Sequence, residues 1–466
     1  MAIGRRCLLC IGSRKQSCRT LLLALMGTSL LLFFITQSGM KTPFLHGLQH
    51  PTPSLQSPYP SRRIQDYQAD SDDVTGQRAF SNDSSGLSSG REVEVVDETD
   101  LLGAGAERRT AEVLLQKSTP MDTLEQTVQE ILKTERQIIR EAMLGYSFHP
   151  ALNTKRIEDL VPKYGGKPVR SLVITTWRSG STFIGDVLQS HPGTYYHYEP
   201  LMDFDIKQVR HGTAAKQALH NLHHLLNCDY SEMDHYLNYG QGHQWLFEHN
   251  KRLWQYCKAF PHICWSPRFL TPFCKLFPFQ SLKTVRLRLN LTTEFLQDKR
   301  LGVQVLLLVR DPRGTMQSRR HRVWCPDNPD CDDPAWLCQD LVSDFHTAKK
   351  FQTMFPNSFR MVRYEDLSFN VYNMTKKLFD FFHLSYHPRV QAFLDTHTKQ
   401  TIGGVSSTFR DSKVAPIHWQ QDLSWKDVKQ IQSVCGKALR LWGYKIAKDE
   451  AHLRSFNPVG EFKNVL

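Results

Sequence analysis

The chain has 466 residues, of which 40% are hydrophobic and 22% charged, and its formal net charge is +12. This length gives room for one large or two ordinary domains with a substantial core, which excludes a small fold held together by disulfides alone. The excess of lysine and arginine favours anionic partners such as a nucleotide, an acidic polysaccharide, nucleic acid or an acidic membrane, although a generally basic solvated surface would also explain it.

The N-terminus carries a signal for membrane insertion. Residues Leu21 to Thr36 contain no charge, and five basic residues precede them. With its flanks the run approaches the ~17–25 residues of a membrane span, and its basic side should stay in the cytoplasm. We therefore expect a cytoplasmic tail at 1–20, a signal anchor at 21–38 and a lumenal remainder, as in a single-pass type II protein. A signal peptide cleaved near Ser38 is the alternative.

Two segments of different character follow the anchor. Residues 39–118 are rich in Pro, Ser, Gly, Gln and Asp without a sustained apolar period, which predicts a flexible lumenal stem. Thr119 and Pro120 then offer an N-cap and a first-turn proline, and apolar residues recur at helical spacing, so a stem helix is predicted over 119–145. This helix could pair with a second copy in a homodimer or pack on the domain, and packing is the simpler expectation.

Cysteine usage fits an oxidising compartment. Three of the eleven cysteines precede the predicted anchor and eight follow it. An even lumenal number suits disulfides, and the clusters lack the CxxC pairs typical of a zinc site. Sequons at Asn82, Asn290 and Asn373 predict surface N-glycosylation. The histidine-rich run that contains His220 and His224 is typical of an exposed helix face, and we assign it no function.

From residue 168 onward the pattern predicts an α/β domain. Short β-branched or aliphatic runs alternate with longer helical stretches, and strands are expected at 170–176, 194–198, 282–287, 303–309 and 359–364. Such alternation implies a mainly parallel sheet with helices on both faces, and ligands of such sheets bind beyond the carboxyl ends of the strands. The domain is expected to end near residue 448, which leaves 449–466 as a C-terminal tail.

The turn after the first predicted strand is suited to hold an anion. Its sequence, RSGST at 178–182, places small and hydroxyl residues between a strand and a helix, so that several N–H groups point into one concavity at a helix N-terminus. Ser181 and Thr182 add hydroxyl donors, and Arg178 adds a cation able to bond two oxygens. The Walker lysine is missing from the turn, and a Gly/Ser turn without a ligand is the alternative.

A second cationic element follows the fourth predicted strand. Arg310 ends the run LLLVR, and the helix after it carries Ser318. Two anion-binding elements on neighbouring strand ends suit a ligand with phosphates at two separated points, such as a dinucleotide or a nucleotide phosphorylated at its 5′ and 3′ carbons. An Arg310–Asp311 pair that caps the turn is the alternative.

Six motifs in the same order resemble those of sulfotransferases that use 3′-phosphoadenosine 5′-phosphosulfate (PAPS), over most of residues 168–448. The likeness is closest to the Golgi carbohydrate 6-O-sulfotransferases of the galactose, N-acetylgalactosamine and N-acetylglucosamine group, including the chondroitin 6-sulfotransferases. The matching segments are RSGSTF at 178, YEPL at 198, LKTVRLR at 282, LVRDPR at 308, VRYEDL at 362 and CGKALRLWGYK at 435.

This resemblance implies a P-loop-like three-layer α/β sandwich, a Golgi membrane location and roles for residues at the matching positions. PAPS would be the co-substrate, and Arg178 would replace the Walker lysine. Arg310 and Ser318 would hold its 3′-phosphate. The residues implied for the 5′-phosphosulfate are Arg178, Ser179, Gly180, Ser181, Thr182 and Phe183.

The chemistry expected is in-line transfer of an SO3 group to a sugar hydroxyl. Negative charge builds on the bridging oxygen of the departing nucleotide, where Arg178 and the amides of the turn would stabilise it, so no metal is expected. A base should take the proton of the hydroxyl, and Glu199 is the candidate, with His197 in reserve. A Glu199 carboxylate that pairs with Arg178 or orders the loop is the alternative.

Acceptor recognition is less well specified. Arg286 and Arg288, on one face of the third predicted strand, could grip a uronate or sulfate, or could be ordinary edge cations. The family's C-terminal loop usually ends in Trp followed by a basic residue, whereas here Trp419 is followed by Gln420. Arg410 could compensate for that departure.

These observations together predict a metal-independent carbohydrate sulfotransferase. Its acceptor would be an acidic or N-acetylhexosamine-containing glycan, such as a glycosaminoglycan, sulfated at a 6-hydroxyl, and nucleic acid is not expected as a partner. A lumenal P-loop-type kinase is one alternative, but it needs a metal-holding carboxylate near the turn, and only Asp311 comes close. A Golgi glycan-binding protein with a decayed catalytic turn is the other, and the intact Arg178, Ser181 and Arg310 argue against it.

Overall fold

The computed structural model describes residues 122–404, 407–462 and 466 of the chain. The predicted tail, anchor and stem at 1–118 lie outside these residues, as do Asn82 and the expected start of the stem helix at Thr119 and Pro120. Among the residues described, no helix combines the length and the apolar character needed to cross a membrane.

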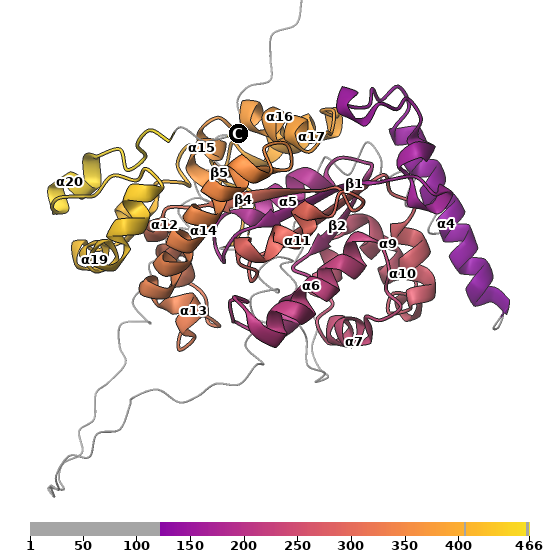
Figure 1. Ribbon diagram of the computed structural model, residues 1–466, viewed down its shortest axis with the longest axis horizontal. Helices are drawn as coiled ribbons and strands as arrows, with labels where there is room; N and C mark the ends of the chain where they lie inside the picture. The colour runs from indigo at the N-terminus through magenta and orange to yellow at the C-terminus, as the bar shows by residue number, and fades with distance from the viewer. Residues whose placement is uncertain (1–121, 405–406, 463–465) are drawn as a thin grey trace, which may run out of the picture. The chain divides into compact units, whose positions relative to one another are not determined.

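A five-stranded parallel sheet lies at the centre of the domain, in the order β2-β3-β1-β4-β5 (Figure 1). Every residue of β1 is buried, as expected for a strand covered by helices on both faces. The predicted α/β class with a parallel sheet is therefore confirmed. The strands are β1 (Val169–Ile174), β2 (Thr194–Tyr198), β3 (Phe279–Thr284), β4 (Val303–Val309) and β5 (Phe359–Arg363).

The third strand differs from its predicted range of 282–287. β3 pairs with β1 from Phe279 to Thr284, so that Lys283 lies opposite Val173. Its buried polar residues hide it in the sequence, because Gln280, Ser281 and Lys283 do not read as a core strand. The last three residues of the predicted range, Val285, Arg286 and Leu287, lie just beyond the carboxyl end of β3.

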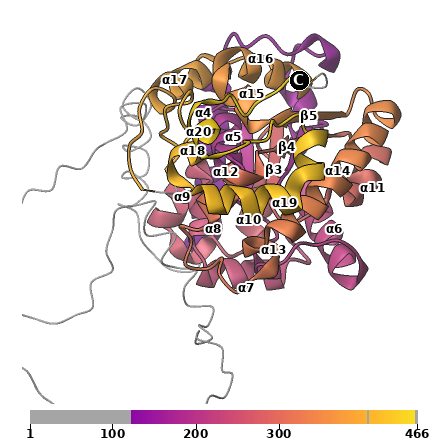
Figure 2. The same cartoon turned by 90° about the vertical axis from the view of Figure 1, so that its left-hand side faces the viewer.

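Helices cover both faces of the sheet, and the crossovers decide which face each takes. α5 (Ser181–Gln189) leads from β1 toward β2, whereas α11 (Thr293–Gln297) and α14 (Pro334–Met354) lead in the opposite direction. Right-handed connections therefore put α5 on one face and α11 and α14 on the other. α16 (Val371–Phe381) and α17 (Pro388–His397) join the α5 face, and Figures 1 and 2 show them across the sheet from α6 (Gly212–Leu226).

The remaining helices of the domain fill the connections. Between β2 and β3, α6 is followed by α7 (Asp234–Gly242), α8 (Trp245–Glu248), α9 (Lys251–Ala259) and α10 (Pro267–Cys274). Between β4 and β5, α14 is preceded by α12 (Pro312–Arg319) and α13 (Pro329–Asp332). After β5 come α15 (Tyr364–Phe369), α18 (Trp419–Asp422), α19 (Trp425–Leu441) and α20 (Glu450–Ser455).

The predicted stem helix packs on the domain. It is observed as α4 (Asp122–Ala142), and its apolar stripe, Val128, Ile131, Leu132 and Ile139, belongs to the main core. Glu135 is fully buried on the same face and accepts hydrogen bonds from Arg252 and from the hydroxyl of Tyr256 at 3.0 Å.

The C-terminal tail is also part of the domain. Arg363, at the end of β5, donates a 2.9 Å hydrogen bond to the carbonyl of Gly460, and Tyr444 pairs with Val459 in a short antiparallel bridge. The domain described therefore reaches beyond the predicted limits of 168 and 448 at both ends, because the segments on either side carry buried apolar residues.

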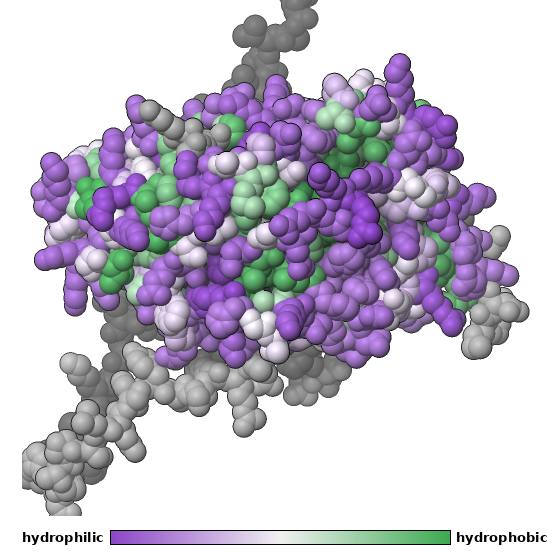
Figure 3. Space-filling view, in the orientation of Figure 1, coloured by the Kyte–Doolittle hydropathy of each residue, from purple (hydrophilic) through white to green (hydrophobic). Residues whose placement is uncertain are grey.

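All eight cysteines that follow the predicted anchor form disulfides, as their even number suggested. The pairs are Cys228–Cys274, Cys257–Cys264, Cys325–Cys331 and Cys338–Cys435. The face of the molecule in Figure 3 is largely hydrophilic, with apolar residues in scattered patches. Asn290 and Asn373 of the predicted sequons are both exposed.

Candidate active site

The loop between β1 and α5 forms a concavity of backbone N–H groups. Arg178 and Gly180 have positive φ values of 64° and 86° on either side of Ser179, and such a change of hand turns successive N–H groups toward one side. α5 begins directly after Gly180, and no side chain among the described residues caps it. The N–H groups of its first turn therefore have no partner within the helix and are available to an anion.

Two residues of this loop are fixed by close contacts. A Cβ at Gly180 would lie 2.4 Å from the ring of Tyr364, so only glycine fits there. Ser179 is fully buried, and its Oγ lies 2.7 Å from Oγ1 of Thr175. Of the residues predicted to bind the donor, Ser179 can thus offer its backbone, while its side chain orders the loop.

The segment after β4 is held by a network beneath it. Asp311 caps α12 by accepting from the N–H of Arg313 at 2.9 Å, and its carboxylate also binds the Arg313 guanidinium at 2.7 Å. The N–H of Asp311 donates to Glu365, whose other oxygen accepts from the hydroxyl of Tyr444 at 2.7 Å. Burial, together with the nearby Asp311 carboxylate, raises the pKa of Glu365 to about 7. Asp311, the carboxylate that a kinase would need, is occupied by Arg313 and is buried.

The two predicted anion-binding elements touch each other. The Arg310 guanidinium donates a 2.9 Å hydrogen bond to the carbonyl of Arg178, and Arg178 Nε donates at 3.0 Å to Oγ of Ser318. Arg310 also lies over the ring of Tyr364, 4.8 Å from its centroid, and in the described part of the chain its buried Nε has no hydrogen-bond partner. Three residues that are up to 140 positions apart in sequence thus meet at one point.

This meeting point is the topological switch of the sheet. β1 and β4 are neighbours, and the chain leaves β1 toward one face and β4 toward the other. Ligands of open α/β sheets bind in the crevice that such diverging connections create. The fold therefore places Arg178 and Arg310 where a ligand is expected.

Glu199, the predicted base, is buried in an ion-pair cluster. It follows β2 with a φ of 44°, and its two carboxylate oxygens accept from Lys283 Nζ at 2.5 Å and from Arg286 at 3.2 Å. Burial lowers the pKa of Lys283, and the Glu199 carboxylate partly offsets this. The alternative to the base, a Glu199 carboxylate paired with a cation, is observed with Lys283 and Arg286 as the partners; the alternative had named Arg178.

Lys283 is the residue that the sequence reasoning missed. It lies within β3, is 1% exposed, and its ammonium is 4.0 Å from the centroid of the Tyr198 ring. A lysine inside a core strand is rare unless it is paired, and this was the signal available in the motif LKTVRLR. His197, the reserve base, lies in the core beside Tyr195, and burial lowers its pKa to about 3. It therefore does not face the loop.

The two arginines considered for acceptor binding are buried. Arg286 donates to the carbonyl of Asp205 at 2.6 Å in addition to Glu199. Arg288 donates to Gln208 at 2.7 Å and forms an ion pair with Asp344, which is itself buried. Both guanidinium groups therefore bind protein partners and do not face solvent as acceptor binding would require. The reason is that both residues lie past the end of β3, where their side chains turn inward.

The C-terminal loop approaches the same region. Arg410 is half-buried and donates to carbonyls of its own loop, including Phe409 at 2.8 Å, and burial lowers its pKa. Trp419 is fully buried, with the guanidinium of Arg313 4.4 Å from its ring centroid. This tryptophan packs under α12, so its role here is to support the segment that carries Arg310 and Ser318.

Comparison with known proteins identifies the relatives of this fold. A profile of the sulfotransferase family matches residues 172–388. Carbohydrate sulfotransferase 5 of Mus musculus is 26% identical over 63% of this chain and 85% of its own length, and carbohydrate sulfotransferase 4 of Mus musculus is 27% identical over 60% and 82%. Among solved structures, a sulfotransferase from Mycobacterium tuberculosis is 12% identical and covers 81% of this chain and 99% of its own, with a TM-score of 0.30.

Proposed function

We infer that this chain, whose residues 172–388 form a domain of the sulfotransferase family, takes a sulfuryl group from PAPS and passes it to a sugar hydroxyl. The relatives support the enzyme class, a carbohydrate sulfotransferase with a sulfonate donor. PAPS as the donor, the 6-hydroxyl as the acceptor atom, and a glycosaminoglycan or related glycan as the acceptor chain are our proposals. A Golgi location behind an anchor at 21–38 and glycosylation at Asn82, Asn290 and Asn373 belong to the same proposal.

One observation carries the donor proposal: Arg178 and Arg310 meet at the carboxyl ends of adjacent strands. The concavity of N–H groups around Gly180 and the start of α5 suits a sulfated phosphate, and Arg310 with Ser318 suits a second phosphate on the same molecule. Nε of Arg310 has no hydrogen-bond partner among the described residues, so it is a further donor that could bind the ligand. When bound, PAPS supplies an activated sulfuryl group whose leaving group is the nucleotide phosphate.

The residues around the loop would stabilise charge on that leaving group. Arg178 is held by Ser318, and its carbonyl is held by Arg310, so the cation is oriented before the donor arrives. Donors fixed in advance do not need to reorganise during the reaction, and this is the basis of their catalytic effect. Ser181 and Thr182, in the first turn of α5, add hydroxyl groups at the same helix N-terminus.

We propose Glu199 as the group that takes the proton of the acceptor hydroxyl. Its position after β2 puts it at the carboxyl end of the sheet, and its carboxylate is a hydrogen-bond acceptor at present satisfied by Lys283 and Arg286. In this role the buried carboxylate must become accessible to the hydroxyl when the acceptor binds. If it stays enclosed, Glu199 is a positioning residue that fixes Lys283.

The function is tested with the full-length chain and radiolabelled PAPS. Chondroitin, keratan and N-acetylglucosamine-terminated glycans serve as acceptors, each with and without EDTA. We expect label in at least one glycan, insensitive to EDTA, and located on the 6-oxygen of the labelled sugar. Transfer that depends on ATP and Mg²⁺ would establish the kinase alternative instead, and binding of glycan without transfer from any donor would indicate a decayed enzyme.

Glu199→Gln separates the two roles of that residue. If Glu199 is the base, this variant should still bind PAPS, and its kcat should fall about 10²- to 10⁴-fold with little change in KM. Lys283→Met is the matched variant, because it removes the partner and keeps the carboxylate. Near-normal turnover of Glu199→Gln, with a lowered Tm in both variants, would assign Glu199 to structure.

A further inference from the structure

A cluster of histidine and carboxylate side chains lies at the end of α6. His220 and His224 are one turn apart on this helix, with ring centroids 4.3 Å apart, and Glu232 follows in the next loop. Oε2 of Glu232 is 3.8 Å from Nε2 of His220 and 3.8 Å from Nε2 of His224. One ligand atom from each residue lies within 4.8 Å of the others. This arrangement belongs to no part of the proposed active site.

We propose that these three residues bind a zinc ion, through Nε2 of His220, Nε2 of His224 and the Glu232 carboxylate. Zinc takes imidazole nitrogen and carboxylate oxygen at about 2.0–2.2 Å, which sets tetrahedral ligand atoms roughly 3.4 Å apart. Glu232 lies 3.8 Å from each histidine nitrogen and the whole set lies within 4.8 Å, so the three side chains must close around the ion when it binds. Histidines at i and i+4 face the same side of a helix, which is the spacing used by helical zinc sites. Three protein ligands leave the fourth position to water.

A second carboxylate stands behind one of the ligands. Oδ2 of Asp229 is 3.4 Å from Nδ1 of His224, the ring nitrogen that would not hold the metal. Asp229 is held in turn, because its other oxygen accepts from the N–H and the hydroxyl of Ser231. A carboxylate that accepts from the distal nitrogen fixes the tautomer and the ring orientation of a metal-binding histidine.

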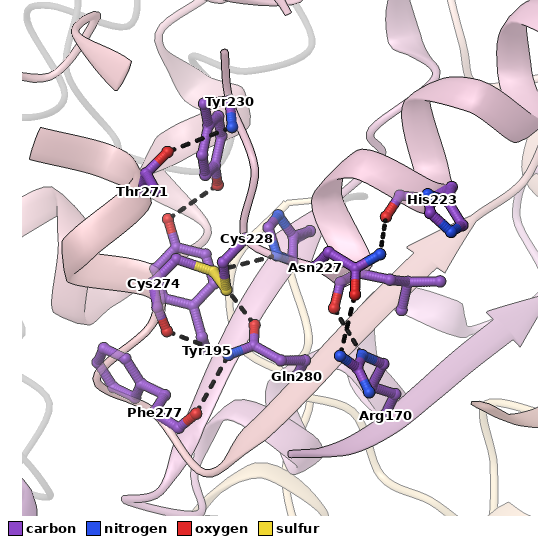
Figure 4. Close-up of a disulfide and its surroundings, with 12 residues drawn as sticks. Arg170, Tyr195, His223, Asn227, Cys228, Tyr230, Thr271, Cys274, Phe277 and Gln280 are labelled. Carbon is purple, nitrogen blue, oxygen red and sulfur yellow. Dashed lines mark hydrogen bonds between the residues drawn. A yellow bond between two sulfur atoms is a disulfide. The ribbon is translucent and has the colours of Figure 1, made fainter. Parts of the chain in front are cut away.

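The backbone around the cluster is fixed by a disulfide. The loop that carries Asp229 and Glu232 begins at Cys228, which is bonded to Cys274 of α10 and adopts a φ of 51° (Figure 4). The N–H of Tyr230 also donates to Oγ1 of Thr271 at 3.2 Å. The loop is therefore tied at its start to a second helix, and the distance between the α6 histidines and Glu232 is set by the fold.

The end of α6 is tied to the sheet as well. Arg170, the second residue of β1, donates to the carbonyl of Leu226 at 2.7 Å and to the side chain of Asn227 at 3.1 Å, and Asn227 donates to the carbonyl of His223 (Figure 4). This contact also locates the cluster. It adjoins the amino end of β1, whereas Arg178 follows the carboxyl end, and the strand between them spans roughly 20 Å. Zinc here would join α6 to the following loop without taking part in sulfuryl transfer.

The test measures zinc binding by the full-length chain after EDTA treatment and removal of the chelator. We expect isothermal titration with ZnCl₂ to show a site that His220→Gln and Glu232→Gln each weaken at least 100-fold. His223→Gln is the matched control, because this exposed histidine lies on the same helix beside the pair and should leave the site unchanged. Wild-type protein that binds no zinc, or binding that is equal in wild type and both ligand variants, would overturn the proposal.

A second measurement does not depend on the ligand variants being folded. Asp229→Asn keeps all three ligands and removes only the negative charge 3.4 Å behind His224, so zinc affinity should fall about 10- to 100-fold while the stoichiometry stays the same. Added zinc should raise the Tm of wild type and of His223→Gln, but not that of Glu232→Gln. An equal rise in Tm in all three would show that zinc binds elsewhere. Sulfotransferase assays of the same proteins test the proposed function independently of this site.

Discussion

The carboxyl edge of the sheet holds two groups of cations in different surroundings. At the ends of β1 and β4, Arg178 and Arg310 are half-buried and donate to the Ser318 hydroxyl and to a backbone carbonyl. Past the end of β3, Arg288 is fully enclosed and bonded to a carboxylate. Arg178 and Arg310 each donate to a neutral oxygen, whereas Arg288 is paired with a buried acid.

This difference separates a binding role from a structural one. A guanidinium held by neutral partners keeps its charge for an incoming anion, whereas one paired with a buried carboxylate has little left to offer and cannot move without exposing its partner. Sequence pattern alone treats both groups as arginines near strand ends. Substitutions in each group test whether Arg178 has a binding role and Arg288 a structural one.

Arg288→Met should have the largest effect, and the effect should be on stability. It leaves the Asp344 carboxylate buried without its cation, which costs about 3–5 kcal/mol of unfolding free energy. Replacing both residues, as in Arg288→Met with Asp344→Leu, should recover most of that loss. Urea denaturation measures both changes. If Arg288→Met instead raises the KM for a charged acceptor at unchanged stability, Arg288 belongs with the binding group.

Arg178→Ala tests the other side of the comparison. Sulfuryl transfer should fall about 10²- to 10³-fold, because a preorganised donor to the developing charge is lost. Alanine and arginine carry the same Cβ, so the backbone at φ 64° is equally strained in both and the Tm should change little. The control is Arg300→Ala, which removes an arginine that is 95% exposed. Full activity of Arg178→Ala would remove this residue from the site.

The sequence was sufficient where backbone geometry follows from residue type. The loop at 178–182 contains a glycine, Gly180, at the position where φ is positive. The strand–turn–helix pattern around this loop predicts that it lies at the carboxyl end of the first strand. Alternation of strands and helices predicted the parallel sheet, and apolar spacing predicted the helix that is observed as α4.

Long-range pairing is what the sequence could not supply. Glu199 and Lys283 are 84 residues apart, and Arg288 and Asp344 are 56 apart, so nothing local shows that these charges neutralise each other. The same limitation explains why the predicted range of β3 differs from the observed one. The buried polar residues of β3 bond to partners that only the folded chain brings near, as the hydroxyl of Ser171 does for Ser281. For the same reason the sequence does not show that Glu232 lies beside His220 and His224.

Glu365 is a buried carboxylate beneath Arg310. Its partners are neutral hydrogen-bond donors, whereas the partner of Asp344 is the cation of Arg288. The pKa of Glu365 is raised from 4.5 to about 7, so the folded state binds its proton more tightly than the unfolded state does. Stability should therefore fall as pH rises from about 4.5 to about 7, by roughly 3 kcal/mol in total, and stay low above that range. Glu365→Gln, which cannot ionise, should flatten this part of the curve. Urea denaturation at a series of pH values measures it, and an equal slope in both proteins would show that the Glu365 carboxyl is already ionised at low pH.

Ser318→Ala should have the smallest effect, and it tests whether a neutral partner positions a binding cation. The side chain of Arg178 loses a 3.0 Å hydrogen bond but keeps its charge, so the KM for PAPS should rise about fivefold, equivalent to roughly 1 kcal/mol, with kcat reduced by a similar factor or less. Ser318→Thr retains the hydroxyl and should restore the wild-type KM. If Ser318→Ala matched Arg178→Ala in its loss of transfer, the contribution of the hydroxyl to holding the 3′-phosphate would exceed its contribution to positioning Arg178. If Ser318→Ala changed neither KM nor kcat, the hydrogen bond from Arg310 to the Arg178 carbonyl would be enough to hold the loop. The contact between Arg178 and Ser318 would then have no role in the reaction.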